Sequence, residues 1–214
     1  MDLDSVTIRT AELGDLNGIA AIYSTLWCNT LRNRGDVEDA DLAARFNIAM
    51  QLQRSPVALV AEAEGRVIAA CCVGIFDEGA PRTNPAWQAC YDELLAQATE
   101  RAKTADDKLE GSLFGDSREK ATADRFAATG NDYAQGQINL VIIEPAWQGH
   151  GLGRVLIERA RAELRAAGCS KFFLMTDCSS DWQFYEHLGM ERILEDHSQD
   201  TGDGFIVFMY GAEA

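Results

Sequence analysis

Residues 137–168 read QINLVIIEPAWQGHGLGRVLIERARAELRAAG, and this stretch predicts the centre of the fold. It opens with a short apolar, β-branched run that is typical of a buried strand: Ile138, Leu140, Val141, Ile142 and Ile143. Glu144 and Pro145 end that strand. A helix is predicted next, from apolar residues at a spacing of four: Leu152, Leu156, Ala160 and Leu164. Gly168 then stands where a helix commonly ends, at C′.

Between the predicted strand and helix, residues 148–154 carry glycines at three alternate positions, Gly149, Gly151 and Gly153. Glycine lets the backbone approach a ligand closely, and the free N–H groups at a helix start favour an anion, usually phosphate. The dinucleotide fingerprint G-x-G-x-x-G fails here because Arg154 stands where its third glycine is needed. The nucleotide-triphosphate loop fails because G-K-[ST] is missing. A turn softened by glycine, with no ligand, is the alternative.

Gln148-Gly149-His150-Gly151-Leu152-Gly153 resembles the acyl-CoA loop, Q/R-x-x-G-x-G/A, of the GNAT superfamily of N-acetyltransferases. The preceding strand and its Glu-Pro end also resemble that family. Further along, residues 184–190 read FYEHLGM and resemble the second family signature, F/Y-Y-x-x-x-G-F. The two signatures stand in the family's order, and the resemblance covers the chain apart from one insertion.

The resemblance implies an α/β (α+β) fold, in which helices flank a central mixed, mostly antiparallel sheet. It implies a single domain over residues 1–214, with a helical insertion at about residues 77–136 between the third and fourth strands. The order of the expected elements agrees: a strand near residues 6–9, a helix capped by Thr10, a helix over 39–54, and a hairpin of 57–63 and 67–76. Ser117 is expected to cap the second helix of the insertion. A strand over 171–176, a short helix over 182–188 and a last pair of strands at 193–194 and 205–210 complete the expected elements.

The resemblance also implies an activity, the transfer of an acetyl group from acetyl-CoA to a primary amine through a tetrahedral intermediate. The backbone of Val141, Ile142 and Ile143 would lie beside the pantetheine and thioester. The loop amides, together with His150 and Arg154, would face the pyrophosphate. Tyr185 occupies the family's position for the general acid that protonates the CoA thiolate. Cys178 occupies a position where several relatives have an asparagine that contacts CoA, and this departure puts that contact in doubt.

A general base is harder to assign. A primary amine with a pKa near 10.4 is almost fully protonated at pH 7, so some group must accept its proton. The place of the glutamate used by some relatives is occupied by Phe173. The sequence leaves a water chain and four carboxylates as candidates: Asp77, Glu78, Glu144 and Asp177.

The composition limits the possible partners. The chain has 214 residues and a formal net charge of -15, which argues against sequence-independent binding to nucleic acid or anionic lipid. A cationic acceptor, a small molecule or a peptide, fits better. The six cysteines show no C-x-x-C and no metal spacing with the histidines, so reduced thiols in a cytoplasm are expected. No signal peptide or apolar run of membrane-spanning length stands out.

Several alternatives remain open. The domain could bind acyl-CoA as a sensor or scaffold without turnover, or it could use a longer acyl group, which pocket volume near Ile142 would decide. The insertion could form a lid or homodimer contact, or it could select the substrate. Its many acidic residues could steer cationic amines, or they could only solvate a helical surface.

Overall fold

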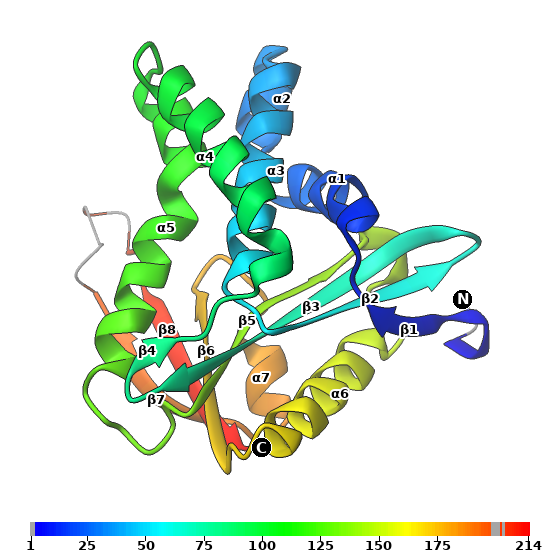
Figure 1. Cartoon of the computed structure of the whole chain (residues 1–214), viewed down its shortest axis with the longest axis vertical. Helices are drawn as coiled ribbons and strands as arrows, with labels where there is room; N and C mark the ends of the chain where they lie inside the picture. Colours follow the sequence, from blue (N-terminus) through cyan, green and yellow to red (C-terminus); the bar gives the residue numbers. More distant parts are fainter. Residues whose placement is uncertain (1–2, 198–201, 203) are drawn as a thin grey trace.

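The computed structural model describes residues 3–197, 202 and 204–214 (Figure 1). One sheet runs through this part of the chain in the order β1-β2-β3-β5-β6-β8-β7, and β4 pairs with β3 off that path. Every pairing is antiparallel except β5 with β6. The strands are β1 Thr7–Thr10, β2 Val57–Ala63, β3 Arg66–Asp77, β4 Ala80–Pro81, β5 Gly136–Ile143, β6 Lys171–Asp177, β7 Glu191–Asp196 and β8 Val207–Glu213.

Helices cover both faces of the sheet (Figure 1). One apolar cluster packs α1, α3, α4 and α5 on one face, and a second cluster packs α6 on the other. The helices are α1 Leu16–Trp27, α2 Asn29–Arg34, α3 Val37–Gln53, α4 Gln88–Ala102, α5 Asp107–Ala127, α6 Leu152–Ala166 and α7 Gln183–His187. No described helix is both long and apolar enough to cross a bilayer. This architecture confirms the expected mixed, mostly antiparallel sheet flanked by helices.

The central unit forms as its sequence predicts. Helix α6 buries the residues of its predicted stripe, Leu152, Leu156, Ala160 and Leu164, against the sheet. Gly168 has a φ of 88°, the left-handed conformation expected one residue after the C-cap. The predicted hairpin also forms, as β2 and β3. The loop expected before the last strand lies largely outside the described residues.

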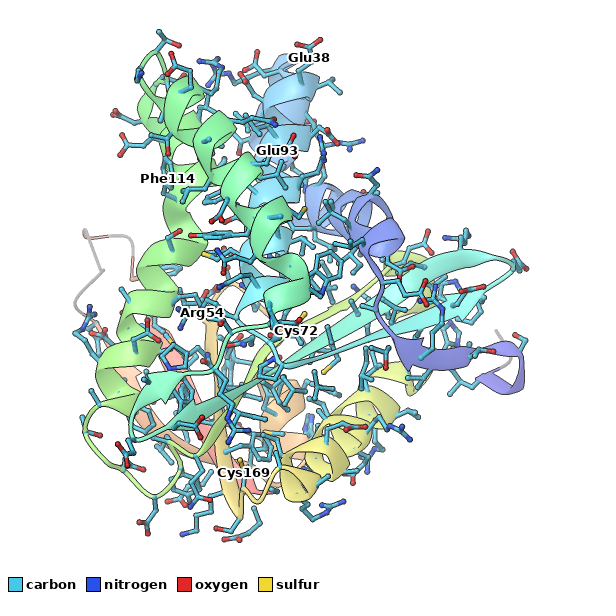
Figure 2. All side chains as sticks on the ribbon, in the orientation of Figure 1. Glu38, Arg54, Cys72, Glu93, Phe114 and Cys169 are labelled. Atoms are coloured by element: carbon cyan, nitrogen blue, oxygen red, sulfur yellow. The ribbon has the colours of Figure 1, made fainter. Side chains whose placement is uncertain are left out.

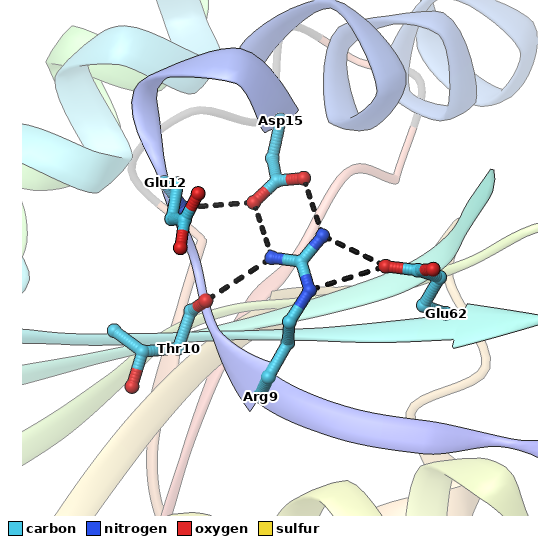
Figure 3. Close-up of polar contacts among 5 residues, drawn as sticks. All are labelled: Arg9, Thr10, Glu12, Asp15 and Glu62. Carbon is cyan, nitrogen blue, oxygen red and sulfur yellow. Dashed lines mark hydrogen bonds and ion pairs between the residues drawn. The ribbon is translucent and has the colours of Figure 1, made fainter. Parts of the chain in front are cut away.

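The start of the chain differs from the prediction that Thr10 caps a helix. Thr10 is the last residue of β1, and α1 begins only at Leu16, after a 3-10 turn over Leu13–Asp15. Arg9 holds this junction together, because its guanidinium donates to Asp15 at 2.7 and 2.9 Å and to Glu62 on β2 at 2.9 and 3.1 Å (Figure 3). The carboxylate of Asp15, rather than Thr10, satisfies the turn, because it accepts from the Glu12 amide at 2.8 Å.

The insertion is a pair of packed helices. Phe46 on α3 stacks on Tyr91 of α4 at 6.1 Å between ring centroids, and it meets Phe114 of α5 edge-on at 5.7 Å. Figure 2 shows Phe114 on α5 within this helical layer. The cap predicted at Ser117 is wrong, because Ser117 lies inside α5. The true N-cap is Asp106, whose side chain accepts from the amide of Leu109 at 2.9 Å.

Helix α2 has no counterpart among the expected elements. It is short, it ends at Gly35 in the left-handed conformation, and it buries one apolar side chain, Leu31. So few apolar positions give no helical period to detect.

Candidate active site

Strands β5 and β6 separate along their length. They pair in parallel only through Gln137 with Phe173 and Ile138 with Leu174, although both strands continue beyond these pairs. Past Ile138, the β5 edge that faces β6 therefore has no strand partner among the described residues. A sheet opened in this way presents backbone N–H and C=O groups to a ligand.

A bulge at Asn139 accompanies this opening. The β3–β5 register shifts between Cys72 and Val73, and the shift leaves Asn139 between the paired residues. Its side chain donates to Ser55 Oγ at 2.9 Å and to the Arg54 carbonyl at 3.2 Å. Its own carbonyl accepts from the buried Lys120 at 3.1 Å. The bulge also reverses the alternation of side chains, so that later residues of β5 exchange faces.

The exchange of faces is visible in the core. Ile138 packs in the α6 cluster, and so do Val141 and Ile143, whereas Leu140 and Ile142 pack in the cluster of α1 and α3. In a regular strand Ile138 and Leu140 would share a face. The bulge thus changes which side chains of β5 face each layer, and the backbone beyond it lines the opening between β5 and β6.

A cavity of about 1240 Å³ fills this opening. Its walls come from β5, β6, the glycine loop, α7, the α1–α2 region and helix α5 of the insertion. Nine residues assigned to the site from the sequence line it: Val141, Ile142, Ile143, Gln148, Gly149, Gly151, Gly153, Arg154 and Tyr185. Two signatures that lie far apart in the sequence thus share one cavity.

The glycine loop has the shape of an anion site. Gly149 and Gly151 have φ values of 76° and 90°, which side chains rarely adopt. The first hydrogen bond of α6 runs from the Val155 amide to the Gly151 carbonyl at 3.2 Å, so the preceding amides are available to a ligand. Gln148 braces the loop by donating to the Ile143 carbonyl at 3.0 Å. The exposed Arg154 adds a positive charge at the cavity. These donors fit a pyrophosphate.

Gly153 has a different role, because it allows close packing. A Cβ atom there would lie 3.1 Å from Phe184 Cζ and 3.3 Å from Ile143 Cδ1. The helix start therefore sits directly against the end of β5 and against the residue before Tyr185. A larger residue at this position would push against Phe184 and so displace its neighbour Tyr185.

Tyr185 lies on α7 and is half-buried. Its ring contacts Phe184 at 5.4 Å and Tyr210 at 5.8 Å between centroids. Its hydroxyl has no hydrogen-bond partner within the described ranges. Burial raises the pKa of Tyr185, and the negative charges of Asp181 and Glu119 raise it further. The side chain thus remains a protonated phenol at physiological pH, able to donate into the cavity.

Three residues assigned from the sequence do not line the cavity. The side chain of Leu152 is buried in the core, so only its backbone could contribute, and His150 is exposed outside the cavity walls. Cys178 instead faces the chain before β8, where its Sγ accepts from the Ile206 amide at 3.3 Å. This placement does not support the predicted contact of Cys178 with CoA.

The structure separates the four candidate bases. Asp77 and Glu78 line a different cavity, of about 460 Å³, where Asp77 pairs with Arg82. Glu144 pairs with Arg66 and does not line the larger cavity. Asp177 lines it, but its Oδ1 accepts from the Ser179 amide at 2.7 Å and from the hydroxyls of Ser179 and Ser180.

Sequence reasoning missed several polar residues of the cavity as site residues, among them Gln51 on α3, and Asp116 and Glu119 on α5. The two acidic residues stand three apart, which places them on one face of a helix. That spacing was the available signal, but only the packing of α5 on α3 shows that the face points into the cavity.

Comparison with known proteins agrees with this geometry. The model of the acetyltransferase (GNAT) family matches residues 19–190. Similar solved structures include a Drosophila melanogaster polyamine N-acetyltransferase, with 16% identity, a TM-score of 0.56 and coverage of 98% of this chain and 100% of that one. A putative acetyltransferase from Salmonella typhimurium, solved with acetyl-CoA, has 18% identity, a TM-score of 0.52 and coverage of 98% and 94%.

The ribosomal-protein-S18-alanine N-acetyltransferase of Escherichia coli has 15% identity, a TM-score of 0.54 and coverage of 97% of this chain and 93% of that one. Identities this low show a shared fold and nothing finer. Among curated proteins, none matches the sequence. The family match, however, spans most of the chain, including the glycine loop and Tyr185. The chain therefore belongs to the GNAT acetyltransferase family.

Proposed function

We propose that this acyltransferase moves the acetyl group of acetyl-CoA to a primary amine of a cationic small molecule or peptide, by direct attack through a tetrahedral intermediate. One observation carries the proposal: a single cavity joins the glycine loop, the unpaired edge of β5, Tyr185 and an acidic wall. Each of these parts meets a different demand of acetyl transfer.

The loop and strand serve the acyl donor. The amides at the start of α6 and the guanidinium of Arg154 would hold the pyrophosphate. The pantetheine would then run along β5, with its thioester near the residues past the bulge. A backbone N–H on that edge would stabilise the oxyanion, an interaction whose loss typically costs about 2.7–4 kcal/mol. Tyr185 would protonate the departing thiolate.

The opposite wall serves the acceptor. Among the side chains that the structure describes, five carboxylates and two basic groups line the cavity, and Arg154 is at the donor end. Three of these carboxylates belong to α5 of the insertion: Asp107, Asp116 and Glu119. This distribution favours a cationic acceptor and supports the reading of the insertion as a substrate-selecting element. The name of the Drosophila relative, a polyamine N-acetyltransferase, points to the same class of acceptor.

The test is release of CoA thiol from acetyl-CoA, with and without a panel of amines. The panel should span polyamines, guanidinium-bearing amines, amino acids and peptides with free N-termini. We expect release to depend on an amine and to be fastest with cationic acceptors. Tight CoA binding without release for any amine would instead favour a sensor or scaffold.

A further inference from the structure

We propose that Glu119 of helix α5 is the general base that accepts the proton of the acceptor amine, and that Gln51 and Asp116 help to hold that amine beside it. The inference rests on the proposed acetyl transfer and adds the residues that would bind and deprotonate its acceptor. The assignment stands on where these side chains lie in the cavity and on which of their atoms are already engaged.

Asp116 and Glu119 line the same cavity but differ in their bonding. Both carboxylate oxygens of Asp116 are engaged, because Oδ1 accepts from the Tyr23 hydroxyl at 3.0 Å and Oδ2 accepts from Gln51 Nε2 at 3.2 Å. Glu119 accepts no hydrogen bond from any residue in the described part of the chain. Asp116 is therefore fixed in place, while the oxygens of Glu119 are available to a ligand.

Gln51 supplies an independent sign of a ligand. The residue is 2% exposed and lines the cavity, and its Nε2 donates a hydrogen bond to Asp116 Oδ2. Its Oε1 is buried with no donor among the described residues. Buried amide oxygens ordinarily have a donor, and the N–H groups of an amine that binds against this wall would supply one. The carboxylates of Asp116 and Glu119 and this unsatisfied amide oxygen are all acceptors, which suit an ammonium group.

The surroundings of Glu119 adjust its basicity. Burial raises the pKa of Glu119; the ammonium of Lys120 lowers it, and the charges of Asp116 and Asp177 raise it. Tyr23 on α1 lines the same cavity, and burial together with the charges of Asp116 and Glu119 raises its pKa. A carboxylate with a raised pKa lies closer to the basicity of an amine and is a better proton acceptor.

Glu119 and Tyr185 come from different sides of the cavity. Glu119 lies on α5 and Tyr185 on α7, yet the charge of Glu119 contributes to the raised pKa of Tyr185. Asp181, before α7, contributes to the pKa of the same tyrosine. A base and an acid that act on one reacting centre need this arrangement, because one takes a proton from the nucleophile and the other gives a proton to the leaving group.

In the proposed reaction the acceptor nitrogen loses two protons, one to Glu119 and one to Tyr185. Glu119 takes one proton from the ammonium and passes it to solvent, and the neutral nitrogen attacks the acetyl carbonyl carbon. The C–N bond forms, and the C–S bond breaks as Tyr185 protonates the thiolate. The second proton lost by the nitrogen restores the tyrosine hydroxyl. Overall, an ammonium and a thioester give an amide, a thiol and one proton.

The experiment compares wild type with Glu119→Gln over pH 6.5–9.5, with the best acceptor of the panel. At pH 7 we expect kcat to fall by about 10²–10⁴-fold. Because the variant depends on acceptor that is already deprotonated, the gap should narrow by about tenfold per pH unit toward the amine pKa of about 10.4. CoA affinity, measured by calorimetry, should stay near wild type.

Glu93→Gln is the matched control, because Glu93 is an exposed glutamate on α4 of the same insertion and does not line the cavity. It should keep the wild-type pH profile. In a second variant, Glu119→Ala, added formate should restore turnover in a saturable way. A loss of rate that is equal at every pH, or wild-type turnover in Glu119→Gln, would overturn the assignment. Lack of transfer by wild type itself would instead overturn the proposed function.

Discussion

Replacement of Tyr185 by phenylalanine isolates the chemistry of one hydroxyl. The ring contacts with Phe184 and Tyr210 survive the change, and the hydroxyl has no partner among the described residues. The free energy of unfolding should therefore change by no more than about 0.5 kcal/mol. Affinity for CoA should also change little, because the hydroxyl is needed chiefly when the thiolate leaves.

Turnover should respond much more strongly. General acid catalysis contributes about 10²–10⁴-fold, which corresponds to about 2.7–5.4 kcal/mol of transition-state stabilisation at 1.36 kcal/mol per tenfold. The raised pKa of Tyr185 adds a second expectation: the phenol stays protonated below about pH 10, so its ionisation produces no fall in wild-type activity over that range.

The assay is single-turnover release of CoA thiol with saturating acceptor, so that product release does not mask the chemical step. Tyr133→Phe is the control, because its hydroxyl donates to Glu191 at 2.9 Å and the residue does not line the cavity. It should keep wild-type turnover. A Tyr185→Phe enzyme with unchanged single-turnover rates would refute the general-acid role and leave Tyr185 a packing residue.

Three further predictions concern the loop, the fold and the acceptor. Gly151→Val should weaken CoA binding in calorimetry because it strains a left-handed backbone position; wild-type affinity in the folded variant would show that the loop does not hold the pyrophosphate. Arg9→Ala should lower the free energy of unfolding by about 1–3 kcal/mol at pH 7. Because Arg9 lowers the pKa of Asp15, the ionised pair stabilises the fold above the ordinary value of 3.8 and loses this effect as pH falls further; an equal loss at pH 7 and pH 2 in denaturant titrations would contradict this. Finally, kcat/KM for a polycationic amine should fall more steeply from 20 to 300 mM salt than for an amine without further charge; parallel slopes would exclude electrostatic steering.

The parts of the fold that were predictable are those with local signals. The apolar run of β5, the stripe of α6 and the C′ glycine at Gly168 each depend on residues close in sequence. Leu152, for example, is buried because its helix has one apolar face. Tyr185 was predictable through a signature, and the cavity that it lines unites both signatures.

The parts that escaped prediction depend on contacts between distant segments. The sequence near Asn139 carries no signal of a bulge, because the residues that hold the bulge, Ser55 and Lys120, are distant in sequence. Thr10 has the residue type of a helix cap. In the structure it ends strand β1, beside Arg9, which binds Asp15 and Glu62. Glu119 looks like one more surface carboxylate of an acidic helix. Only the packing of α5 over the opening between β5 and β6 places it in the cavity.

The most direct test of acetyl transfer to an amine uses acetyl-CoA that carries an isotopic label in its acetyl group. After incubation with the best cationic acceptor, mass spectrometry follows the label. Direct transfer predicts one labelled acetyl group on the amine nitrogen for each CoA thiol released, with none retained on the protein. Label found only in free acetate, or attached to the enzyme as an intermediate, would contradict direct transfer to an amine.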